Sequence, residues 1–119
     1  MSNENTIESI KKASYYCQSC YTSMELFNDL VENRKLELLN PLLAKIIEDI
    51  SNLIRFYSNI NSQDLLISDM NSKLEIFLDG YENLDYYYIK DIFIYEMIPV
   101  VENIFNEIKR NISVQQNYN

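Results

Sequence analysis

Hydrophobic residues recur every three or four positions along most of this chain, and polar residues fill the positions between them. This is the spacing of one face of an α-helix, which completes a turn in about 3.6 residues. The pattern divides the chain into four amphipathic segments, at about residues 6–34, 41–59, 62–84 and 85–112. We therefore predict four helices, followed by a polar tail over residues 113–119 that we expect to be frayed.

Polar residues and proline mark where three of these helices begin. Asn40 precedes Pro41, and proline is favoured in the first turn of a helix because its missing N–H is not needed there. Ser62 with Asp64 is typical of the start of the third helix, and Asp85 of the start of the fourth. The fourth segment also contains Pro99, where we expect a kink.

The connections between the four segments are short, which favours antiparallel neighbours. The chain of 119 residues contains one Gly and two Pro, too few for the turns that sheet proteins require. With 47% hydrophobic residues, it can fill one hydrophobic core. The predicted fold is all-α, an antiparallel up-down-up-down four-helix bundle, with residues 1–112 as a single domain.

The charge balance limits the classes of partner. With 18 acidic and 10 basic residues, the formal net charge is −8, which disfavours nucleic acid and anionic membranes. The longest apolar stretch, residues 86–101, contains Lys90, Asp91 and Glu96 and is too short to span a bilayer. The first residues lack a basic segment followed by an apolar one, so we expect a cytoplasmic protein.

No residue pattern predicts an active site or a cofactor. The chain contains no His, which excludes His-dependent nucleophiles and the His ligands of di-iron helical bundles. Cys17 and Cys20 form a C-x-x-C pair, but no second pair exists to complete a zinc site. Because both fall within the apolar stripe of a helix, we interpret them as buried, reduced core residues and expect neither a metal nor another cofactor.

The fourth helix has one feature that a solvated surface does not explain. A helical wheel places its core residues in one arc: Phe93, Ile94, Met97, Ile98, Val100, Val101, Ile104, Phe105, Ile108 and Ile112. Tyr88, Ile92 and Tyr95 fall in the opposite, polar arc, beside Pro99. Either the first helix or a loop covers them, or they form an exposed site for another protein, where aromatic residues edged by charge are typical.

The same region carries a sequence motif. Residues 85–99 read D-Y-x-x-x-x-D-x-x-x-Y-E-x-x-P. This segment resembles a poorly characterised family of small helical proteins of Gram-positive bacteria, some members of which are encoded near flagellar or motility genes. The resemblance implies a helical accessory protein and singles out Asp85, Asp91, Tyr95, Glu96 and Pro99. These residues could instead form a buried polar network in which Asp91 accepts a hydrogen bond from the Tyr95 hydroxyl.

The sequence thus favours a non-enzymatic protein-interaction module, such as an adaptor or a chaperone-like accessory protein associated with motility. Its candidate partner-binding residues are Tyr88, Asp91, Ile92, Tyr95, Glu96 and Pro99. The partner would be another protein, bound through a helix or a basic surface. The alternative is an immunity or antitoxin-type inhibitor that presents carboxylates to a basic toxin, with an association slowed steeply by salt. The sequence leaves the oligomeric state open.

Overall fold

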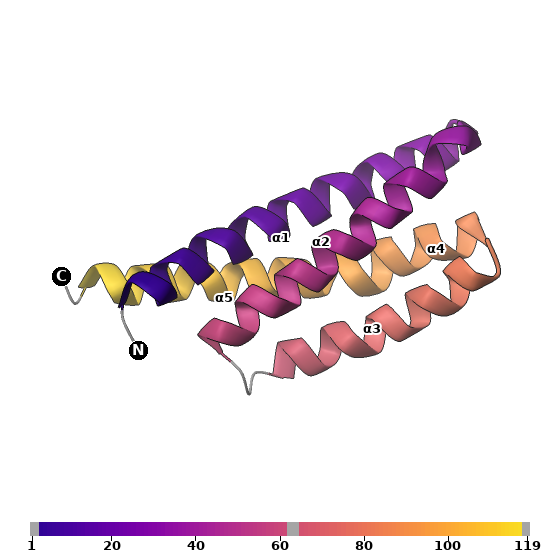
Figure 1. The fold of residues 1–119 in the computed structure, drawn as a ribbon. Coiled ribbons are helices and arrows are strands. Elements are labelled where there is room, and N and C mark those ends of the chain that lie inside the picture. Colours follow the sequence, from indigo (N-terminus) through magenta and orange to yellow (C-terminus); the bar gives the residue numbers. More distant parts are fainter. Residues whose placement is uncertain (1–2, 62–64, 118–119) are drawn as a thin grey trace.

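The computed structural model describes residues 3–61 and 65–117, with side chains over 6–61 and 65–112. Its described parts contain only helices and short connections: α1 (Asn3–Glu32), the 3-10 turn η1 (Leu36–Leu38), α2 (Leu39–Ile60), α3 (Leu65–Glu82), α4 (Tyr86–Ile92), the π-helical turn η2 (Phe93–Met97) and α5 (Ile98–Asn117). The last three follow without interruption as one long helix. Four helices thus alternate in direction within a body of 50 × 22 × 19 Å, which confirms the predicted bundle (Figure 1).

The helix starts agree with the sequence prediction in part. Pro41 lies in the first turn of α2, but the helix begins at Leu39, so Asn40 is not its cap. Asp85 caps α4 as predicted, because its carboxylate accepts a hydrogen bond of 3.1 Å from the backbone N–H of Tyr88. Ser62 and Asp64 lie outside the described residues. The helix α5 continues to Asn117, beyond the predicted end at residue 112.

Two helices end with a left-handed residue that is not glycine. Arg34 follows α1 with φ 59°, and Leu84 follows α3 with φ 52°. The next backbone N–H closes each turn across six residues, Lys35 to Leu30 O at 2.9 Å and Asp85 to Gly80 O at 3.1 Å. This is the Schellman arrangement, in which glycine is usual because a side chain strains the left-handed backbone.

The core runs through all four helices, and α1 contributes a long stripe to it. Its fully buried residues are Ala13, Cys17, Cys20, Met24, Phe27 and Val31. The sequence prediction was correct for Cys17 and Cys20. Ile7 and Tyr21 occur at the spacing of the same stripe but are 41% and 38% exposed. The ring of Phe27 meets that of Phe93 at 5.1 Å between centroids, edge to face, and so joins α1 to the fourth helix.

The π-helical turn changes which side chains of the fourth helix face the core. The N–H of Ile98 bonds to the carbonyl of Phe93, five residues back, so η2 holds one residue more than an α-turn would. Side chains before this turn are therefore rotated by about 100°, the angle of one residue, relative to a regular helix. Ile92, predicted in the polar arc, is 3% exposed, whereas Ile94, predicted in the core, is 37% exposed.

The orientation of the side chains before the π-helical turn gives a direct prediction for Ile92 and Ile94. Ile92→Ala should lower the free energy of unfolding by about 2 to 5 kcal/mol, because it leaves a cavity in the core. Ile94→Ala is the matched control and should cost less than about 1 kcal/mol, since the side chain is partly solvated. Urea denaturation followed by circular dichroism measures both. Equal losses would contradict the rotation at η2.

Candidate functional site

Large side chains are exposed along one side of the fourth helix. Tyr87 is 60% exposed, Tyr88 41% and Tyr95 72%, and Asp91 and Pro99 are exposed as well. We call these five residues the outer face. Of the six predicted site residues, Tyr88, Asp91, Tyr95 and Pro99 belong to it. The other two do not: Ile92 is buried in the core beneath, and the half-buried Glu96 forms an ion pair.

Tyr88 rests against the single glycine of the chain. A Cβ atom built on Gly80 in α3 would lie 2.9 Å from Cδ2 of Tyr88 and 3.1 Å from Cγ1 of the buried Ile89. Glycine within a helix costs about 1 kcal/mol relative to alanine. Its presence here is explained by this close approach of α4 to α3, which seats one edge of the Tyr88 ring and leaves the rest exposed.

The motif over residues 85–99 separates into structural and exposed positions. Asp85 caps α4, and Glu96 accepts from Lys73 of α3 at 2.7 Å, a contact that raises the pKa of Lys73. Asp91 and Tyr95 are both exposed, and no hydrogen bond joins them among the described residues. The buried polar network considered from the sequence is therefore wrong, and Asp91 and Tyr95 remain available to a partner.

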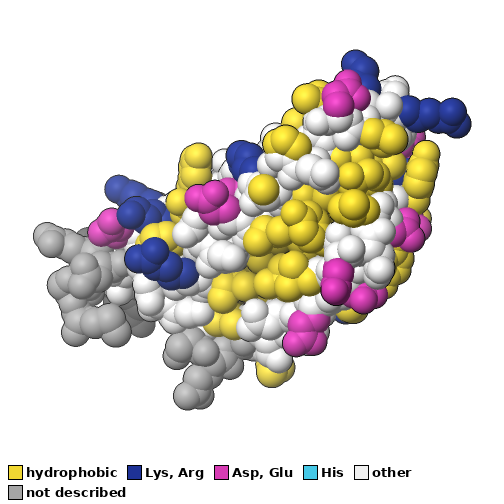
Figure 2. Space-filling model, turned by 45° about the vertical axis from the view of Figure 1, so that its right-hand side comes forward, with side chains coloured by type: hydrophobic (Ala, Val, Ile, Leu, Met, Phe, Trp, Pro, Cys, Tyr) yellow, Lys and Arg dark blue, Asp and Glu magenta, His cyan; other side chains and the backbone are white. Residues whose placement is uncertain are grey.

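A second apolar surface lies where α1 meets η1 and α3 meets α4. A hollow of about 620 Å³ is lined there by Arg34, Leu36, Asn83, Leu84, Asp85, Tyr86 and Tyr87. Leu36 and Leu84 are 48% and 54% exposed, so the strained residue Leu84 displays its side chain to solvent. Figure 2 shows hydrophobic side chains gathered into a continuous area on one face of the molecule, with acidic side chains along its edge.

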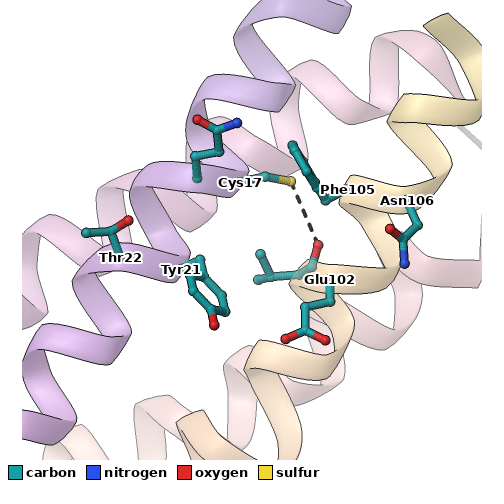
Figure 3. A pocket seen from close by; sticks show the side chains of 8 residues that line it. Cys17, Tyr21, Thr22, Glu102, Phe105 and Asn106 are labelled. Atoms are coloured by element: carbon teal, nitrogen blue, oxygen red, sulfur yellow. Dashed lines mark hydrogen bonds between the residues drawn. The ribbon is translucent and has the colours of Figure 1, made fainter.

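A groove runs between α1 and the fourth helix. One part, of about 530 Å³, is lined by Cys17, Gln18, Tyr21, Thr22, Val101, Glu102, Phe105 and Asn106. Figure 3 shows Tyr21 extending from α1 toward α5, with Glu102 on the facing helix and Phe105 further along it. The other part, of about 350 Å³, is lined by Tyr21, Glu25, Asn28, Asp29, Glu32, Lys90, Ile94, Ile98 and Glu102. Tyr21 and Glu102 line both parts.

The groove is acidic. The carboxylate of Glu25, which accepts the hydrogen bond of the Tyr21 hydroxyl, raises the pKa of Tyr21, and Glu102 adds to the effect. Lys90 donates to Glu32 at one end, and this hydrogen bond lowers the pKa of Glu32. The local field therefore favours positive charge, because a proton is held more tightly where carboxylates gather.

A polar network joins α1 to α2 on another side of α1. Lys45 Nζ donates to Asp49 Oδ2 at 2.7 Å and to the hydroxyls of Ser19 and Ser23 at 2.7 and 3.1 Å. Ser19 also donates to Asp49 at 2.8 Å. Asp49 is 6% exposed, so these donors satisfy a carboxylate that burial would otherwise destabilise. We assign this network a structural role.

Cys17 and Cys20 are buried, as predicted, and both are free thiols. Burial raises the pKa of Cys17 to about 12, and that of Cys20 in the same direction, with Asp49 adding to the shift at Cys20. The thiol of Cys17 donates a weak hydrogen bond to Val101 O at 3.9 Å. Thiols are nucleophiles only when ionised, so this environment makes both unreactive.

The raised thiol pKa values predict a loss of stability at high pH. Unfolded thiols release their protons near 9.0, whereas folded Cys17 keeps its proton up to about 12. The stabilisation is therefore complete below 9.0 and is lost as the pH rises toward 12. Urea denaturation at a series of pH values should show this decline, and it should be shallower in the variant Cys17→Ala with Cys20→Ala. An identical pH dependence of the two proteins would show that the buried thiols do not cause the loss of stability.

The groove is the main feature that the sequence pattern did not reveal. The helical wheel placed Phe105 among the core residues of the fourth helix, and no motif linked it to Tyr21 or Glu102. One signal was present: Asn28 lies beside Phe27 near the apolar stripe of α1 and is 8% exposed in the structure. A polar side chain at a buried position is a reason to search for a site.

Two further findings concern the class of protein. Within residues 3–61 and 65–117, no helix has the length and hydrophobicity needed to cross a membrane, and the side chains described there form no group of three or more potential metal ligands.

No curated protein and no solved structure matches the chain significantly. A family model described as a domain of unknown function, DUF8042, matches residues 8–107, which is most of the bundle. The chain therefore belongs to the DUF8042 family.

Proposed function

We propose that this protein is a non-enzymatic interaction module that binds another protein through the outer face of the fourth helix. The observation that carries the proposal is the exposure of Tyr87, Tyr88 and Tyr95 on a helix whose underside is fully packed. Tyrosine supplies a large contact area at a small cost in conformational entropy, and it is enriched among the residues that dominate binding energy.

The rigidity of the supporting helix adds to this argument. Ile89, Phe93 and Met97 are fully buried directly beneath the outer face. The backbone that displays the tyrosines is thus held by the core, so binding does not require ordering of a loop. A pre-organised surface loses less free energy on association than a flexible one.

The acidic and proline residues of the outer face give it selectivity. Asp91 is exposed between the tyrosines, and Pro99 is exposed at the far end. A carboxylate among aromatic side chains favours a partner that offers an apolar surface with a nearby donor or cation. A role as an adaptor or chaperone-like accessory protein associated with motility is part of the proposal, and it is supported by the resemblance of residues 85–99.

The test is affinity capture from the native cell with the tagged protein, followed by titration of the captured partner. Tyr95→Ala should change the free energy of unfolding by no more than about 0.5 kcal/mol, but remove more than about 1 kcal/mol of affinity. Tyr15→Ala is the matched control, because Tyr15 is 64% exposed on α1, outside the outer face.

Two outcomes would contradict this proposal. Equal affinities of the Tyr95→Ala and Tyr15→Ala variants would show that the outer face does not bind the partner. An association rate that falls steeply with salt, together with no effect of Tyr95→Ala, would instead favour the acidic inhibitor considered from the sequence.

A further inference from the structure

We propose that the groove between α1 and the fourth helix binds a basic segment of a partner protein and seats an arginine side chain against Glu25 and Glu102. This inference rests on the proposed interaction role, but it concerns a second surface and a defined chemistry. It follows from three observations: the shape of the groove, an excess of carboxylates along it, and an unpaired amide oxygen.

The shape of the groove suits a peptide segment. Its two parts, of about 530 and 350 Å³, both border Tyr21 and Glu102 and lie along the same pair of helices, α1 and the fourth helix. The apolar side chains lining the part next to α5 are the half-buried Phe105 and, beneath it, the buried Cys17 and Val101. A third helix or an extended segment can place apolar side chains on that surface and polar ones beyond it, as in other helix-in-groove complexes.

The charge of the groove selects a cationic occupant. Four carboxylates line its acidic part, those of Glu25, Asp29, Glu32 and Glu102, whereas Lys90 is the one basic residue among the lining side chains that the structure describes. Lys90 is paired with Glu32. Among the described residues, Glu25, Asp29 and Glu102 therefore have no cationic partner, which is the complement of a basic segment.

Asn28 points to a hydrogen-bond donor as part of the ligand. This residue lines the acidic part of the groove and is 8% exposed, and its Oδ1 accepts no hydrogen bond from any described residue. An unsatisfied buried acceptor lowers stability, so a ligand that donates to Asn28 would add a hydrogen bond that no described residue supplies. Oδ1 is itself buried, so a donor in the groove reaches it only after rotation about χ2, which exchanges the amide oxygen and nitrogen.

Arginine fits these groups better than a metal ion does. The described side chains include no group of three or more His, Cys, Asp or Glu residues placed to hold a metal ion. A guanidinium group carries five donors in a planar fork and spreads its charge, so it can reach separated acceptors. Phosphate groups would be repelled by the same carboxylates.

The probe is a synthetic amphipathic peptide that presents arginine and leucine at helical spacing, and the matched peptide carries citrulline in place of arginine. Titrations are followed by calorimetry and by amide chemical shifts of the labelled protein. The arginine peptide should bind at least about tenfold more tightly than the citrulline peptide, since charge-assisted hydrogen bonds are lost in the latter. The shifts should include the side-chain amide of Asn28 and the backbone of residues 21–32.

Matched variants distinguish binding by the groove carboxylates from attraction of the peptide to the overall negative charge of the protein. Glu25→Gln with Glu102→Gln should weaken binding of the arginine peptide by about tenfold. Glu75→Gln with Glu82→Gln changes the net charge equally, but both residues are exposed on α3, and this control should change affinity by less than about twofold. Tyr95→Ala lies outside the groove and should leave binding of the arginine peptide unchanged. The test of the groove is therefore independent of the test of the outer face.

Asn28→Leu provides a readout that a purely structural residue would not give. Removing the unpaired acceptor should raise the melting temperature of the free protein and should lower its affinity for the arginine peptide severalfold. The inference is overturned if the arginine peptide does not bind, if the citrulline peptide binds equally well, or if the α3 control weakens binding as much as the groove variant.

Discussion

The π-helical turn at Phe93–Met97 determines how the fourth helix presents its side chains. Pro99 lies two residues beyond it. In a regular helix its ring would meet the carbonyl of residue 95, and its missing N–H would leave that carbonyl unpaired. The turn widens the helix immediately before this position, with the Ile98 N–H bonded to Phe93 O. The extra residue in this turn thus makes room for the Pro99 ring, and it rotates the side chains before the turn about the helix axis.

The sequence was sufficient to predict the helices but not this rotation. Apolar periodicity identified all four helices, and the Asp85 cap was correct because it depends only on residues next to it. The wheel failed at Ile92 and Ile94 because it assumes one constant angle per residue. The sequence also could not reveal the groove, since Tyr21 and Glu102 meet only once α1 and α5 are packed together.

Both proposed binding surfaces depend on that rotation. In an uninterrupted helix, the core positions of α5 would continue back through Ile94 and Lys90. The π turn moves both to the edge of the groove, where Lys90 pairs with Glu32 and Ile94 stays partly exposed. The same shift carries Ile92 into the core and leaves Asp91 outside. The fourth helix therefore displays tyrosines on one side and borders, on another, the groove whose carboxylates come mostly from α1.

The two surfaces should consequently discriminate between ligands in different ways. The tyrosines of the outer face gain binding energy mainly from buried area, which is insensitive to salt. The groove relies on charge, and salt weakens the attraction between exposed charges, most of all beyond about 10 Å at ordinary ionic strength. Neither surface is carried by a long flexible loop: one borders the packed core, and the other lies between two long helices. Selectivity among partners is thus set by the side chains themselves, because the backbone that holds them is already in place.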